Sequence, residues 1–330
     1  MSDSDTITSV IKPDAGSNRP VRRPGRRKKN GGIALKYSVL WAFTLIAAAL
    51  TAAWMTDRFL LSKPACGQTW LTHIRYSFTL KNLSARLIKN VDFRVYGPVQ
   101  KTATQVCETV DASHPYELIH DACGNQILHF SFAQIAPYGA EIISLKSRLR
   151  VWKKPQPTIC GSRPEMFLMP EPFVESDHPV LEDQAQALKQ SDTLSAAESI
   201  FKWVSGRIRF SGYSAPERGA WYAFSQGKGD CTEYMDLFAA LCRAAGIPCR
   251  RIGGYICPKD QVVSGAGYHN WAEFYADGRW HIADPMNRVF AENPAGYIAV
   301  HVIGGPCSNG MGQCSRFRIE EKRISVRMNS

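Results

Sequence analysis

Hydrophobic side chains alternate with polar ones over residues 66–152 of the 330-residue chain. A period of two predicts half-buried antiparallel β-strands. Turn signals at Gly97-Pro98, Asn125 and residues 137–139 separate the runs, which favours a sandwich-like, β-rich N-terminal domain. The alternating hydrophobic positions are Ile74, Tyr76, Phe78, Leu80, Val91, Phe93, Val95, Leu128, Phe130, Phe132, Ile143, Leu145 and Leu149.

The hydrophobic period becomes helical after a proline-rich stretch. Residues 153–173 contain several prolines, which suit neither a helix nor a central strand, and we interpret this stretch as a linker. Beyond it, hydrophobic residues at spacings of three and four predict helices over residues 181–189 and after Asp192, which we expect to be the N-cap of the second helix. Residues 174–330 are therefore assigned to a second domain.

A hydrophobic run near the start of the chain has the length of a membrane span. Residues 37–55 are about 19 residues without a charge, and a helix of this length crosses the hydrocarbon core of a bilayer. A cleaved signal peptide has a shorter hydrophobic core and a shorter basic start, so an uncleaved anchor is favoured and cleavage before Trp54 is the alternative. We expect a single-pass membrane protein whose N-terminus is cytoplasmic and whose later domains are periplasmic or extracellular.

The net charge of +11 is concentrated in residues 1–36. Nine Lys and Arg residues face three Asp residues there, so this basic cytoplasmic arm carries +6 of the total. Because the arm adjoins the hydrophobic run, we interpret it as a topology signal that contacts anionic lipids of the inner or plasma membrane. Nucleic acid is not an expected partner.

All ten cysteines follow the hydrophobic run, which indicates an oxidising compartment. No pair has the Cys-x-x-Cys spacing of a zinc site, so neither a metal nor another cofactor is expected. The loop between Cys307 and Cys314 suits a local disulfide, and Cys242 and Cys249 fall inside hydrophobic patterns as buried thiols. The cysteines are Cys66, Cys107, Cys123, Cys160, Cys231, Cys242, Cys249, Cys257, Cys307 and Cys314.

Cys231 lies where a glycine-rich turn runs into a helical pattern. Asp230 is a good N-cap, Glu233 completes a capping-box spacing, and Gly246 ends the helix. The free amides and positive dipole at a helix start favour a thiolate and can stabilise an oxyanion. A cysteine at a helix start is, on its own, more often buried or disulfide-bonded.

A predicted hairpin downstream supplies a base for this thiol. Residues 269–285 form two alternating runs around Asp277-Gly278, the dipeptide of a two-residue turn. If position 276 faces position 279, His269 and Asp284 share one face as diagonal neighbours within side-chain reach. His281 points to the other face. Cys231, His269 and Asp284 are thus candidates for a nucleophile, its base and the group that orients the base.

Three sequence blocks, GDCTEYMDLFAALCRAAGIPCRRIGGY, YHNWAEFY and WHIADP, resemble the transglutaminase-like superfamily of papain-fold thiol enzymes over residues 195–290. The resemblance implies an α+β core in which a helix packs on an antiparallel sheet, with Cys231, His269 and Asp284 as the catalytic triad. The alternating region before it is similar to the β-rich N-terminal region of bacterial members. The second oxyanion donor stays open among three candidates, which are Gln226, Trp221 and Tyr213.

This chemistry predicts attack of the thiolate on a peptide or carboxamide carbonyl to give a thioester. Water would resolve the thioester as hydrolysis, which we favour because water is abundant outside the membrane and no acidic groove for an amine is visible. Transfer to an amine, as in protein cross-linking, is one alternative. A membrane-tethered binding or assembly module that keeps the fold without turnover is the other. The expected substrate is a peptide or a protein.

Overall fold

A computed structural model describes most of the chain after residue 68, and the compact unit it belongs to spans Cys66–Ser330. The predicted basic arm at 1–36 and the predicted membrane span at 37–55 lie outside the described residues. Among the helices of the described ranges, none is long and hydrophobic enough to cross a membrane. The described ranges are 69–157, 163–214, 216–292, 294, 296–305, 309–311 and 315–329.

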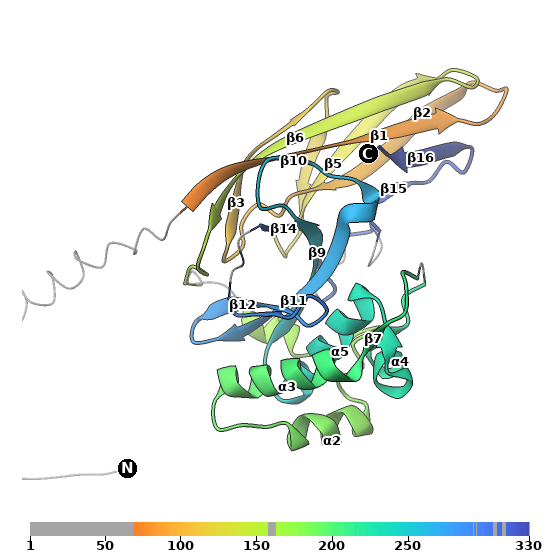
Figure 1. Cartoon of the computed structure of the whole chain (residues 1–330). Coiled ribbons are helices and arrows are strands. Elements are labelled where there is room, and N and C mark those ends of the chain that lie inside the picture. The colour runs from red at the N-terminus through yellow and green to blue at the C-terminus, as the bar shows by residue number, and fades with distance from the viewer. Residues whose placement is uncertain are drawn as a thin grey trace, which may run out of the picture. The chain divides into compact units, whose positions relative to one another are not determined.

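Two antiparallel sheets of the N-terminal region face each other across a hydrophobic core (Figure 1). Their contact is direct, since the rings of Phe78 and Phe93, one from each sheet, lie 5.5 Å apart. Alternate residues of each strand are buried, as the period of two predicts. The strands are β1 (Thr69–Asn82), β2 (Ile88–Gly97), β3 (Gln105–Ala112), β4 (Glu117–His120), β5 (Gln126–Ile135) and β6 (Ala140–Trp152).

Strands from the far end of the chain complete both sheets. β16 (Ile324–Met328) pairs with β1, and β15 (Phe317–Ile319) pairs with β2. β10 (Gln261–Val262) pairs in parallel with the middle of β1, at Ile74 and Arg75. Three short strands within the predicted domain 174–330 thus pair with strands of the N-terminal region. These strands are too short for their hydrophobic pattern to indicate which sheet they join, because the pairing is decided by contacts distant in sequence.

The second region is built on a five-stranded antiparallel sheet with the order β13-β12-β11-β9-β14. Its strands are β9 (Cys249–Ile256), β11 (Tyr268–Ala276), β12 (Arg279–Asp284), β13 (Val289–Phe290) and β14 (Tyr297–Ile303). The short 3-10 helices η1 (Pro164–Phe167) and η2 (Gly265–Gly267) lie in the preceding segments, and β7 (Arg209–Phe210) pairs with β8 (Lys228–Gly229).

Four helices lie on one side of this sheet (Figure 1). Among them, α5 makes the most extensive contact with the strands of the sheet. Hydrophobic side chains of α5 meet those of β11, where Phe238 and Phe274 lie 6.1 Å apart. The helices predicted at 181–189 and after Asp192 are observed with small shifts. The helices are α2 (Pro179–Ala187), α3 (Thr193–Arg207), α4 (Gly219–Gln226) and α5 (Cys231–Ala244).

The edge strand β14 is closed by two buried amide side chains of the N-terminal region. Gln105 accepts a hydrogen bond from the N–H of Ala299 (2.8 Å) and donates to its carbonyl (2.9 Å). Asn125 accepts from the N–H of Val302 (2.7 Å) and donates to its carbonyl (2.9 Å). An unpaired strand edge would leave these backbone groups buried without partners, so the N-terminal region satisfies the edge of the second sheet.

Candidate active site

Cys231 is the first residue of α5, and its side chain is buried. The carboxylate of Asp230 accepts a hydrogen bond from the N–H of Thr232 (2.9 Å), and Glu233 accepts one from the N–H of Asp230 (2.8 Å), which completes the predicted capping box. Position 229 has room only for glycine, since a Cβ there would lie 2.4 Å from the Cβ of Glu233. The thiol is thereby fixed at the positive end of the helix dipole.

The hairpin of β11 and β12 has the predicted register. Ala276 pairs with Arg279 across Asp277 and Gly278. Both turn residues have positive φ, +49° and +74°, as a two-residue turn between twisted strands requires. This register fixes which residues of the two strands share a face.

His269 and Asp284 meet on one face of the hairpin, with Nε2 of His269 2.6 Å from Oδ2 of Asp284. An ionised carboxylate only accepts hydrogen bonds, so Nε2 carries the proton and donates. Nδ1 is then left for the thiol, and a hydrogen bond links His269 to Cys231. The structure brings together the three residues that the sequence singled out, from one helix and two strands.

Two further residues hold the carboxylate of Asp284. The hydroxyl of Tyr297 donates to Oδ2 (2.8 Å), and the backbone N–H of Asn287 donates to Oδ1 (3.1 Å). The side-chain amide of Asn287 also donates to Oδ2 (2.8 Å). Neither Tyr297 nor Asn287 was predicted from the sequence. The spacing of Asn287 three residues after an aspartate could have suggested a turn, whereas nothing local indicates Tyr297.

The electrostatics of the pair favour an ion pair. Burial disfavours the imidazolium of His269, but its hydrogen bonds with Asp284 and Cys231 outweigh burial and raise its pKa to about 9. Burial also opposes ionisation of Asp284, yet the hydrogen bond from His269 and those of its other partners hold its pKa below the usual value. The imidazolium and carboxylate therefore stabilise each other beside Cys231.

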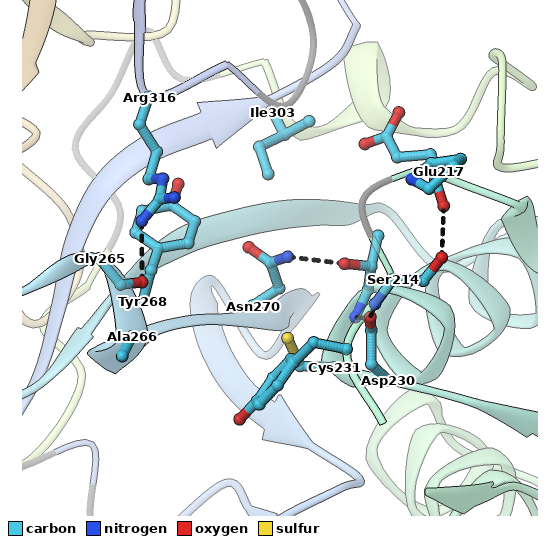
Figure 2. Close-up of a pocket in the computed structure, with 13 residues that line it drawn as sticks. Ser214, Glu217, Asp230, Cys231, Gly265, Ala266, Tyr268, Asn270, Ile303 and Arg316 are labelled. Carbon is cyan, nitrogen blue, oxygen red and sulfur yellow. Dashed lines mark hydrogen bonds between the residues drawn. The ribbon is translucent and has the colours of Figure 1, made fainter. Parts of the chain in front are cut away.

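A cavity of about 520 Å³ opens on Cys231 (Figure 2). One wall comes from the segment before α4 and from the start of α5, and the other from η2, the start of β11 and the segment before β15. The thiol lies between the two walls, so a substrate in the cavity can reach it. The lining residues that carry polar or charged side chains are Tyr213, Ser214, Glu217, Asp230, Cys231, Thr232, Tyr268, Asn270 and Arg316.

The three oxyanion candidates from the sequence lie in different places. Tyr213 lines the cavity and is largely exposed. Trp221 does not line it and instead stacks on His178, with ring centroids 3.9 Å apart. Gln226 is exposed at the end of α4, also away from the cavity lining. Periodicity could not indicate which way Tyr213 points, because the loop before α4 has no regular period, whereas Trp221 and Gln226 lie within α4.

His281 lies on the face of the hairpin opposite to His269, as the register predicts. Its ring stacks on Phe274 with centroids 5.4 Å apart, and its Nε2 lies 3.2 Å from the carbonyl of Ala276. Burial lowers the pKa of His281 below its ordinary value. It does not line the cavity.

Three cavity residues were not anticipated from the sequence. Asn270 donates to the hydroxyl of Thr232 (2.9 Å) and so ties β11 to the first turn of α5. The only sequence signal for Asn270 was its position next to His269. Glu217 and Arg316 lie on the two walls, and neither is near a motif residue in sequence.

The described part of the chain has no group of three or more His, Cys, Asp or Glu side chains placed to hold a metal ion. Among its cysteines, Cys107, Cys231, Cys242, Cys249 and Cys257 are free and buried. The burial predicted for Cys242 and Cys249 is thus confirmed. Cys123 is disulfide-bonded. The predicted bond between Cys307 and Cys314 lies outside the described residues.

Part of the chain is similar in sequence to known proteins. Residues 182–285 match the family model of the transglutaminase-like superfamily. The kyphoscoliosis peptidases of Mus musculus and Homo sapiens are each 31% identical over 101 residues, which is 28% of this chain and 15% of each peptidase. An uncharacterised protein of Mycobacterium leprae (strain TN) is 25% identical over 156 residues, 46% of this chain and 55% of its own. The chain thus spans only a small part of the curated peptidases it matches.

A solved structure extends the likeness in fold. The crystal structure of a candidate cysteine protease from Cytophaga hutchinsonii aligns with a TM-score of 0.50 and 16% identity, covering 80% of this chain and 93% of that one. At this identity the alignment bears on the fold, which it supports for both regions together. The matched segment contains Cys231, His269 and Asp284, and the chain therefore contains a domain of the transglutaminase-like superfamily.

Proposed function

We propose that this chain is a thiol enzyme that hydrolyses peptide or carboxamide bonds through Cys231, His269 and Asp284. The observation that carries the proposal is the 2.6 Å contact between His269 and Asp284, with His269 hydrogen-bonded to a cysteine at a helix start. A thiol, a base and an orienting carboxylate in this arrangement are what nucleophilic catalysis at a carbonyl needs. Membership of the superfamily supports the same chemistry.

Acylation follows from the positions of the three groups. The proton of Cys231 resides on Nδ1 of His269, in keeping with the raised pKa of that ring, and the thiolate sulfur attacks the carbonyl carbon to form a tetrahedral intermediate. Asp284 stabilises the imidazolium that results. His269 then passes the proton to the leaving nitrogen, the C–N bond breaks and the carbonyl re-forms as a thioester on Cys231.

The helix start supplies a donor for the oxyanion. The N–H groups of Thr232 and Glu233 are already directed at the carboxylate of Asp230. The N–H of Cys231 is the first of the helix and has no intrahelical carbonyl to bond, so it is the amide that faces the developing charge. Of the side-chain candidates, Tyr213 is the one that lines the cavity.

The thioester is resolved by a second nucleophile. In hydrolysis, water gives a proton to His269 and attacks the carbonyl, which releases a carboxylic acid and the thiol. A primary amine in place of water would give a new amide instead. We favour water because the cavity opens to solvent, which is present at far higher concentration than any amine.

We also propose that residues 37–55 anchor the enzyme in the membrane with its catalytic region outside the cytoplasm. The charge-free run and the basic arm before it support this topology. A reporter fused after Ser330 should be active only outside the cytoplasm. Activity of a cytoplasmic reporter at the same position would reject the orientation.

Labelling with iodoacetamide at neutral pH tests the nucleophile. We expect stoichiometric modification of Cys231 in the folded protein, found by peptide mass mapping. The other buried thiols are internal controls, since burial raises the pKa of Cys107 and of Cys257 to about 11. Labelling of these cysteines at the same rate as Cys231 would mean that Cys231 is not activated.

A peptide screen tests the reaction itself. Peptides with and without glutamine are incubated with the enzyme and with the Cys231→Ala variant. Each incubation is done with and without a fluorescent primary amine. New carboxylic acids that require Cys231 support hydrolysis, whereas incorporation of the amine in preference to water would replace hydrolysis by acyl transfer. If iodoacetamide labels Cys231 but no peptide in the screen is converted to a product, the result favours a binding module without turnover.

A further inference from the structure

The charged groups of the catalytic cavity are arranged asymmetrically. Among the described residues that line the cavity, Arg316 is the one basic side chain, and it lies on the wall formed by η2 and Tyr268. Glu217 lies on the opposite wall, with the sulfur of Cys231 between the two (Figure 2). A substrate that reaches the thiol therefore has a guanidinium on one side only.

Arg316 is held in place without a carboxylate. One terminal nitrogen, Nη1, donates to the carbonyl of Gly265 (2.9 Å), and the guanidinium lies 5.1 Å from the ring centroid of Tyr268. The hydroxyl of Tyr255 is a further hydrogen-bond partner. No Asp or Glu oxygen of the described chain comes within 4.0 Å of it.

A guanidinium has five N–H donors, and these contacts leave some of them unused. Arg316 is half-buried, so its charge is less well screened than that of a surface arginine. Planar arginine and a carboxylate match each other as a two-bond pair, and such charge-assisted bonds are stronger than neutral ones. A carboxylate is therefore the group that this side of the cavity is equipped to bind.

The N-terminal sandwich positions this arginine. The next residue, Phe317, pairs with Val95 in β2, and the ring of Phe317 lies 5.6 Å from that of Phe78. The carbonyl of Arg316 accepts a hydrogen bond from the N–H of Tyr96 (3.3 Å). The N-terminal sandwich thus holds the guanidinium of Arg316 in the cavity of Cys231, which belongs to the other region.

The carboxyl groups of the cavity do not compete for this role. Both oxygens of Asp230 are occupied, Oδ1 by the N–H of Thr232 and Oδ2 by the N–H of Ser214 (2.8 Å). Glu217 has one buried oxygen, Oε1, without a hydrogen-bond partner in the described structure, and burial raises its pKa. It can bond a substrate amide on the wall opposite Arg316.

We propose that Arg316 binds a carboxylate of the substrate, so that the enzyme acts on amides of acidic peptides. This inference rests on the proposed function, because it assumes that the cavity at Cys231 is where the substrate binds. The carboxylate is either the C-terminal group of the peptide or the side chain of an acidic residue next to the reacting amide. Both sources offer the same two oxygens to the guanidinium.

Equilibrium binding to the Cys231→Ala protein tests the proposal without turnover. The probes are dye-labelled pentapeptides Ala-X-Gln-X-Ala in which X is Glu or Gln, each made as the C-terminal acid and as the C-terminal amide. We expect a peptide with a carboxylate to bind about 10-fold more tightly than its uncharged counterpart at low salt. The pair that shows the difference identifies the source of the carboxylate.

Variants of Arg316 then assign the preference. Arg316→Gln should abolish it, with the affinity for the uncharged peptide unchanged, and Arg316→Lys should restore part of it. Arg318→Gln is the matched control, since Arg318 is exposed two residues away and bonds Glu320 (3.2 Å) instead of lining the cavity. It should leave the preference intact.

The outcomes separate the two proposals. No preference for carboxylates, or a preference that persists in Arg316→Gln, overturns the role of Arg316 even if Cys231 proves catalytic. Equal weakening of charged and uncharged peptides in Arg316→Gln also overturns it, because that result means Arg316 only supports the η2 segment. A preference that depends on Arg316, together with no turnover of any peptide by the protein that retains Cys231, would reject the proposed enzyme activity and keep the carboxylate site.

Discussion

Nε2 of His269 and Oδ2 of Asp284 are 2.6 Å apart, although the two residues do not face each other directly across the hairpin. Trp271 stands next to His269 on the same face, 6.4 Å away between ring centroids. The contact is diagonal and exists because the two-residue turn sets the strand register. Insertion of one residue in the turn would move the carboxylate to the other face.

The first prediction concerns the titration of His269. Its ring should titrate with a pKa of about 9 in the folded protein, because the hydrogen bonds with Asp284 and Cys231 outweigh burial. In Asp284→Asn the pKa should fall, since the amide cannot stabilise the imidazolium. NMR of ring-labelled histidine measures both values. An unchanged pKa in Asp284→Asn would show that the pair is not coupled.

Stability should depend on pH through the same group. The folded pKa of His269 lies above the ordinary value of about 6.5, so its contribution is fully present below about pH 6.5 and is lost as the pH rises to about 9. The full effect is on the order of 3 kcal/mol. Thermal melting of wild type and His269→Asn at pH 6 and pH 9.5 should show the difference between them shrinking at the higher pH. A difference that grows with pH would contradict this sign.

Gly254 is predicted to tolerate no side chain. Gly254 lies in β9 and pairs with His269 of β11. A Cβ on Gly254 would lie 2.0 Å from the backbone carbonyl oxygen of Ile298, and this oxygen cannot shift because it belongs to the neighbouring strand. Gly254→Ala should lower the melting temperature strongly, by a loss of about 3 kcal/mol or more. Gly206→Ala is the control, because its Cβ meets nothing within 4 Å in α3 and should add about 1 kcal/mol. Equal effects of the two would mean that the sheet is packed differently there.

The two amides that close the edge of β14 should each matter for stability. Gln105→Ala leaves the buried N–H of Ala299 without a partner, although its C=O still accepts from the N–H of Val99, and Asn125→Ala removes the partner of both the N–H and the C=O of Val302. Each change costs about 1–3 kcal/mol. Hydrogen exchange at Ala299 and Val302 should speed up accordingly. Gln134→Ala, at an exposed position of β5, should change neither measurement. Unaltered exchange in the first two variants would show that β14 is satisfied by other groups.

The sequence predicted the features that are set locally. The capping box at Asp230 and the turn at Asp277 determine where α5 starts and which residues of the hairpin face each other, and both depend only on neighbours in the chain. For this reason Cys231 and His269 could be placed before the structure was known. The face of His281 followed from the same register.

Features decided by distant contacts could not be predicted in this way. β16 joins β1 across more than two hundred residues, and neither its length nor its composition indicates that partner. Tyr297 reaches Asp284 only because β14 lies beside β9 in the folded sheet. Arg316 enters the cavity because β15 is paired with β2. Such positions depend on tertiary packing, which hydrophobic periodicity does not encode.

Turnover of a peptide substrate by three variants tests the catalytic assignment most directly. His269→Ala should abolish kcat/KM, Asp284→Asn should reduce it by up to about four orders of magnitude, and His281→Ala should leave it nearly unchanged. Circular dichroism and melting temperature confirm that each variant is folded. The account predicts this order, because His269 contacts Asp284 and Cys231 whereas His281 packs on Phe274. Equal losses at His269 and His281, or full activity in Asp284→Asn, would contradict the assignment.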